Sequence, residues 1–131
     1  MTTIKECMKK LDEITVLDME ASVRDAERIM INSKHDHLPV IDAQNEVFGM
    51  LSTFDLIKFL DEKGNPNAGR AWEICSHRLV TCDINISISG AAKMMVDNSL
   101  HHLLVKDQNT VVGLVSSWDL ASYLIKVEVE S

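Results

Sequence analysis

The stretch GMLSTFDL at 49–56 is matched near the other end of the chain by GLVSSWDL at 113–120. In both stretches a glycine precedes two apolar residues and a serine, and an aspartate follows the serine by three positions. Ser-x-x-Asp is typical of a capping box at a helix N-terminus. It is also suited to a ligand, because a carboxylate in the first helical turn can accept hydrogen bonds from sugar hydroxyls. The spacing alone leaves both interpretations open.

The similarity extends beyond these stretches as an internal repeat. A shift of 65 positions aligns Asp18 with Asp83 and His37 with His102. After a one-residue deletion in a polar turn, a shift of 64 aligns the two Gly-x-x-Ser-x-x-Asp stretches, and turns are where deletions are tolerated best. The repeat therefore predicts two copies of one folding unit, with residues 1–64 as the first and residues 65–131 as the second.

Each copy is predicted to have the element order β-α-β-β-α. Apolar residues at spacings of three and four predict an amphipathic helix over 22–33 and an equivalent helix in the second copy. Short β-rich runs around a polar turn predict a hairpin, and a closing helix follows it. Short strands are expected at 14–17 and 79–82, and a short helix at 71–75 with a counterpart in 2–12. The predicted fold class is α/β (α+β), with two units that protect their open sheet surfaces by packing sheet to sheet or edge to edge.

Composition and charge narrow the possible functions. The chain has 131 residues, is 46% hydrophobic and carries a net charge of −7, which disfavours nucleic acid as the main partner. Its three cysteines show no metal-ligand spacing, and neither a signal peptide nor a membrane span is evident. We therefore expect a cytoplasmic protein with reduced thiols and no contact with a membrane.

The tandem units, the His-Leu-Pro-Val strand and the Gly-apolar-apolar-Ser-x-x-Asp junction resemble a pair of cystathionine-β-synthase (CBS) domains, a Bateman module. The resemblance implies that the two units pack in a pseudo-twofold arrangement, with clefts between them that bind AMP, ADP, ATP or S-adenosylmethionine. It also implies a homodimer and a regulatory, energy-sensing role toward an unidentified effector protein, with no required cofactor.

The resemblance also implies roles for individual residues in both copies. Aspartate would bind the ribose, serine would lie on the phosphate side, an apolar residue would line the adenine, and a basic residue would precede the strand near the phosphate. Two departures stand out: Leu104 replaces the proline of the first copy, and histidine replaces the usual arginine, so the fixed charge is lost. Which copy suits phosphate better is left open. The implied ligand-binding residues are His37, Pro39, Met50, Ser52 and Asp55 in the first copy, and His101, His102, Leu114, Ser116 and Asp119 in the second.

Simpler interpretations stand beside these roles. A capping box stabilises a helix by roughly 0.5–2 kcal/mol without any ligand. The histidines at 35, 37, 101 and 102 are interpreted as an incidental cluster, with no metal expected, because no cysteine or paired carboxylate accompanies them. No Gly-x-Ser-x-Gly elbow or ordered catalytic triad is found, so no enzymatic activity is expected. The alternatives to a ligand-binding regulatory module are a ligand-free dimerisation or interaction module and, third, a small hydrolase or metal-dependent enzyme.

Overall fold

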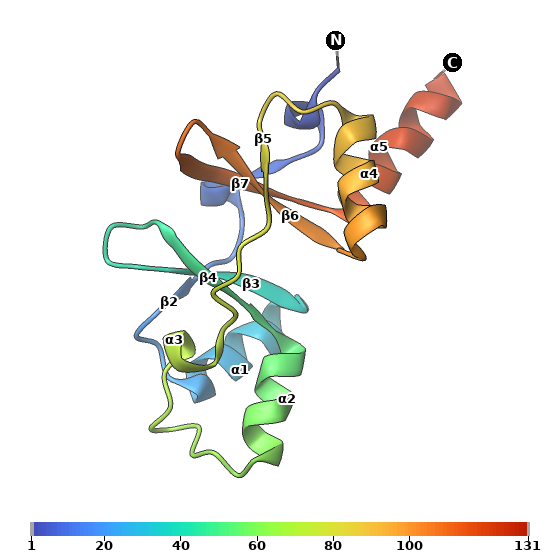
Figure 1. Cartoon of the computed structure of the whole chain (residues 1–131). Helices are drawn as coiled ribbons and strands as arrows, with labels where there is room; N and C mark the ends of the chain where they lie inside the picture. Colours follow the sequence, from blue (N-terminus) through green and yellow to red (C-terminus); the bar gives the residue numbers. More distant parts are fainter. Residues whose placement is uncertain (1, 131) are drawn as a thin grey trace. The chain divides into compact units, whose positions relative to one another are not determined.

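The computed structural model describes residues 2–130, with the backbone alone for Val129 and Glu130, and forms two compact units (Figure 1). The Asp55 unit consists of residues 15–79. The Asp119 unit consists of the described residues of segments 1–14 and 80–131. These units differ from the division into 1–64 and 65–131. The segment before residue 15 packs in the unit of the second repeat, and the linker before residue 80 packs in the unit of the first repeat.

The Asp55 unit contains a three-stranded sheet in the order β2-β3-β4. Strand β2 pairs with β3 in parallel, and β3 pairs with β4 as an antiparallel hairpin. The buried core lies between this sheet and the helices and includes Leu17, Val23, Leu38 and Leu51. The elements are β2 (Leu17–Asp18), α1 (Val23–Ser33), β3 (His37–Ile41), β4 (Val47–Ser52), α2 (Thr53–Asp61) and α3 (Ala71–Ile74).

The Asp119 unit repeats this arrangement with one additional edge strand, in the order β1-β7-β6-β5. Its core includes Ile88, Leu103 and Val115 and also Ile4, from the other end of the chain. Both copies therefore have the β-α-β-β-α order, and the predicted α/β class is confirmed for each unit. The elements are η1 (Ile4–Glu6), β1 (Lys9–Lys10), η2 (Leu11–Glu13), β5 (Thr81–Asp83), α4 (Ile88–Asn98), β6 (His102–Asp107), β7 (Thr110–Ser116) and α5 (Ser117–Glu130).

Local sequence explains where the first helix of each copy begins and ends. Ser22 Oγ accepts a hydrogen bond from the Asp25 amide at 3.0 Å, and Ser87 Oγ accepts one from the Gly90 amide at 2.9 Å. The helices end where Lys34 and Ser99 adopt left-handed backbone conformations, with φ of 58° and 53°. The helix predicted over 22–33 is confirmed. Among the described residues, no helix is long and apolar enough to cross a membrane.

Two segments outside the repeats occupy equivalent places, and we call residues 3–10 and 70–77 the edge segments. Thr3 forms a β-bridge to Ser87, and Arg70 forms one to Ser22, the equivalent of Ser87 in the other copy. The Ile4 amide then donates to the Ile86 carbonyl, as the Ala71 amide donates to the Ala21 carbonyl. A shift of 67 positions therefore relates the two segments, although almost no residue is identical between them.

Each edge segment then passes closely over the glycine of a Gly-x-x-Ser-x-x-Asp stretch. A Cβ atom added to Gly113 would lie 2.5 Å from the Lys9 carbonyl oxygen, and one added to Gly49 would lie 2.6 Å from the Ser76 carbonyl oxygen. Only glycine leaves room for a backbone at this distance. The close approach of a second chain segment therefore explains why glycine occupies this position in both copies. A left-handed conformation does not explain it, because neither glycine has a positive φ.

Candidate functional site

In the Asp55 unit, the predicted site residues gather where the hairpin runs into helix α2. In the strand register, His37 is paired with Ser52 and Pro39 with Met50. The alternate pair, Leu38 and Leu51, belongs to the buried core. Because side chains alternate between the two faces of a sheet, the four predicted residues lie on the face opposite the core.

The Asp119 unit brings its predicted residues together in the same way. His102 is paired with Ser116 and Leu104 with Leu114, whereas the core residues Leu103 and Val115 form the pair between them. His101 directly precedes this pairing, and its carbonyl accepts a hydrogen bond from the Ser117 amide at 2.8 Å. The duplication of the sequence therefore produces a duplicated arrangement of side chains.

Reciprocal hydrogen bonds fix the serine and aspartate of each motif. The Ser52 amide donates to Asp55 Oδ2 at 2.8 Å, and the Asp55 amide donates to Ser52 Oγ at 3.1 Å. The corresponding distances for Ser116 and Asp119 are 2.9 and 3.0 Å. The capping-box interpretation is therefore confirmed in both copies.

The capping box leaves part of each group available for a ligand. One carboxylate oxygen accepts the serine amide, so Oδ1 of Asp55 and Oδ1 of Asp119 lie outside the box. Each serine oxygen accepts a hydrogen bond from the aspartate amide, so its own hydroxyl hydrogen can still be donated. The first amide of each helix is not available to a ligand, because the Thr53 amide donates to the Asp36 carbonyl and the Ser117 amide donates to the His101 carbonyl.

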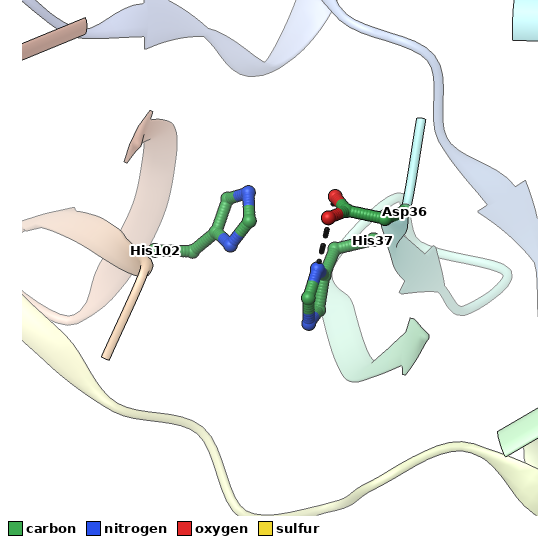
Figure 2. Close-up of side chains that lie close together, drawn as sticks. All are labelled: Asp36, His37 and His102. Atoms are coloured by element: carbon green, nitrogen blue, oxygen red, sulfur yellow. Dashed lines mark hydrogen bonds and ion pairs between the residues drawn. The ribbon is translucent and has the colours of Figure 1, made fainter. Parts of the chain in front are cut away.

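The histidines at the strand starts differ in their neighbours. His37 Nδ1 lies 3.2 Å from Asp36 Oδ1 and donates to this carboxylate (Figure 2). The position equivalent to Asp36 in the second copy is held by His101, which is exposed. The same place beside the helix start therefore carries an acidic side chain in one copy and an imidazole in the other.

The edge segments add groups that the sequence did not reveal as part of the site. Burial raises the pKa of the Cys75 thiol, and the negative charge of Asp55 raises it further. The pKa of Cys7 is raised in the same way, first by burial and then by Asp119. Both thiols are therefore neutral near neutral pH and add no charge to the surroundings of the carboxylates.

Lys9 is the second group supplied by an edge segment. Its Nζ lies 3.8 Å from Asp119 Oδ1, and its side chain is 59% exposed whereas that of Asp119 is 12% exposed. Because strand β1 pairs with β7 over a separation of about a hundred residues, no local pattern could have predicted this contact. The shift of 67 positions that relates the two edge segments could have indicated their similar placement. The segments share almost no residues, so this signal is weak in the sequence.

The fold and the doubled motif are those of CBS domains, and the chain belongs to this family. The CBS domain family model matches residues 2–62 and 71–126. The chain is 26% identical over 121 residues to the CBS domain-containing protein YhcV of Bacillus subtilis, covering 92% of this chain and 84% of YhcV. The resemblance inferred from the sequence is confirmed.

The chain is also similar to a solved structure over its whole length and to part of a longer enzyme. The crystal structure of CBSX2 in complex with AMP superimposes with a TM-score of 0.85 at 19% identity, covering 98% of this chain and 99% of that one. A homoserine O-acetyltransferase of Methanosalsum zhilinae is 28% identical over 116 residues. Although these residues are 88% of this chain, they are only 22% of that enzyme, so the similarity covers about a fifth of its length.

Proposed function

We propose that this chain is a regulatory CBS-domain pair in which the Ser-x-x-Asp junctions bind an adenine nucleotide or adenosyl ligand. One observation carries the proposal: in both copies the aspartate is held at a strand-to-helix junction by its capping box, with Oδ1 outside the box. A carboxylate oriented in this way can accept hydrogen bonds from the two vicinal hydroxyls of a ribose. The AMP bound to CBSX2 supports adenine nucleotides as the ligand class.

The regulatory step would be a shift between two arrangements of the protein. A ligand can favour one arrangement only by as much as its affinity differs between the two. In the proposed function, this shift changes the contacts of the chain with an effector protein. No covalent step is part of the proposal, and AMP, ADP, ATP and S-adenosylmethionine are the ligands to be tested.

A thermal-shift experiment with the four ligands tests this function. At a ligand concentration of 100 times Kd, one occupied site stabilises the protein by about 2.7 kcal/mol. We expect Asp55→Ala combined with Asp119→Ala to abolish the shift, because the ribose hydroxyls lose their acceptors in both copies. A shift of unchanged size in this double variant contradicts the proposed site.

The matched control is Ser22→Ala combined with Ser87→Ala. These serines cap α1 and α4 with the same kind of hydrogen bond but are not part of the proposed ligand-binding residues. Each substitution should cost about 1 kcal/mol of stability, like the loss of any N-cap, and leave the ligand-induced shift intact. The control therefore separates loss of a ligand group from loss of a helix cap.

A homodimer is the second part of the proposal, and exposed apolar side chains on the closing helices support it. Phe54 on α2 is 71% exposed and Trp118, its equivalent on α5, is 76% exposed. Ile57 and Ile125 extend these surfaces along the same helices. Because large apolar groups gathered on one face indicate a protein–protein contact, we assign these helix faces to contact with a second copy.

Sedimentation equilibrium tests the dimer. Trp118→Glu is expected to weaken self-association by at least about tenfold, since a charge would have to be desolvated in the interface. Val96→Glu is the control, because Val96 is similarly exposed, at 78%, but lies on α4. Equal self-association of the wild type and both variants would overturn the assignment of this surface.

A further inference from the structure

The two copies differ in charge at one place supplied by the edge segments. The Lys9 and Ser76 carbonyl oxygens occupy the same position, against Gly113 and Gly49 respectively. Lys9 is also paired with Leu114, as Ser76 is bridged to Met50, the equivalent of Leu114. Lysine and serine are therefore structural equivalents, and at this position only the Asp119 copy receives a cation.

Lys9 places this cation directly beside the proposed ribose-binding group. Its Nζ is 3.8 Å from Asp119 Oδ1, a distance beyond the ordinary range of a hydrogen bond. The ammonium group therefore offsets the negative charge of Asp119 while it keeps the freedom to turn toward a ligand. Among the residues that the structure describes, no lysine, arginine or histidine forms an ion pair with Asp55.

A second difference in charge, at the residue just before the hairpin, has the same sign. The residue whose carbonyl accepts the first helical amide is Asp36 in the Asp55 unit and His101 in the Asp119 unit. The Asp55 copy therefore adds a carboxylate where the Asp119 copy has an imidazole. At these two positions, one in the edge segment and one before the hairpin, the Asp119 copy therefore carries less negative charge.

We propose that Lys9 makes the Asp119 copy the site for phosphorylated adenine ligands, whereas the Asp55 copy binds the adenosyl part with little or no preference for phosphate. The inference rests on the proposed function and assigns a ligand charge to each copy. A phosphate needs cationic donors, and lysine acts toward it as a point charge. A carboxylate with no cation beside it, such as that of Asp55, repels a phosphate instead.

Calorimetric titrations with adenosine, AMP and ATP test the proposal in single-site backgrounds. In Asp55→Ala, which leaves the Asp119 copy, adding Lys9→Gln should weaken ATP binding by about tenfold, the loss of one charge-assisted interaction. Adenosine affinity should change less than about twofold, because adenosine has no phosphate. In Asp119→Ala, which leaves the Asp55 copy, Ser76→Lys should increase the preference for ATP over adenosine.

Lys10→Gln is the matched control, since Lys10 is the next residue on β1 and alternation places its side chain on the opposite face. The effect of Lys9→Gln on ATP should also shrink at high salt, where exposed charges are screened. If all three adenine compounds bind but Lys9→Gln leaves the preference for ATP over adenosine unchanged, the role of Lys9 is overturned. The same holds if Lys10→Gln lowers this preference as much as Lys9→Gln does. In both cases the proposed function still stands. If none of the three compounds binds the wild type, the proposed function and this inference fall together.

Discussion

Replacement of Ile4 by alanine is expected to lower the free energy of unfolding of the Asp119 unit by about 2–5 kcal/mol. Ile4 is fully buried and belongs to the core cluster that contains Leu103 and Val115. Alanine would leave a cavity among them, whereas the hydrogen bond from the amide of residue 4 to the Ile86 carbonyl would be kept. The loss therefore measures the contribution of the side chain of one edge segment to the core.

Hydrogen exchange is the appropriate measurement, because two compact units need not unfold together. The protection of amides in β6 and β7 should fall in Ile4→Ala, while that in β3 and β4 should change little. Ile31→Ala serves as the control, since Ile31 is 67% exposed and its truncation should cost less than about 0.5 kcal/mol. Unchanged protection of β6 in Ile4→Ala would show that the segment before the first repeat is not part of that core.

The elements within each copy were predictable because local patterns determine them. Apolar spacing and the cap of Ser22 predicted α1, and the polar turn between two β-rich runs predicted the β3–β4 hairpin. The short parallel strands were displaced, from 14–17 to Leu17–Asp18 and from 79–82 to Thr81–Asp83. Their bounds follow from pairing with β3 and β6, and a partner strand elsewhere in the chain leaves no trace in the local sequence.

The same distinction applies to the candidate site. Ser52, Asp55, Ser116 and Asp119 could be selected because a capping box is a local pattern that occurs twice. Lys9 could not be selected, since its relation to Asp119 depends on the pairing of β1 with β7. The helix at 71–75 and its counterpart in 2–12 were predicted as short elements. The sequence did not predict that the first packs in the Asp55 unit and the second in the Asp119 unit. Long-range pairing therefore decides which cation accompanies which carboxylate.

Replacement of Gly113 by alanine is expected to destabilise the Asp119 unit by about 1–3 kcal/mol, the usual cost of overpacking. The added Cβ would lie 2.5 Å from the Lys9 carbonyl oxygen, which is a backbone atom and cannot turn away. Strand β1 would have to move from β7, with loss of the pairings of Lys9 and Lys10. Gly49→Ala should act likewise in the Asp55 unit, where the Ser76 carbonyl oxygen lies 2.6 Å from the added atom.

Gly90→Ala is the control that isolates close approach as the cause. Gly90 lies in α4, where the nearest atom to an added Cβ is Ile86 Cγ1 of a side chain, at 3.0 Å. Since alanine is favoured over glycine in a helix by about 1 kcal/mol, and the close atoms belong to the side chains of Ile86 and Ser87, this variant should be less destabilised than Gly113→Ala. Denaturant unfolding and amide exchange of Lys9 and Leu114, which pair between β1 and β7, distinguish the two variants. Because both changes add the same methyl group, equal stability of Gly113→Ala and Gly90→Ala would refute the tight packing of the edge segment on β7, and with it the placement of Lys9 beside Asp119.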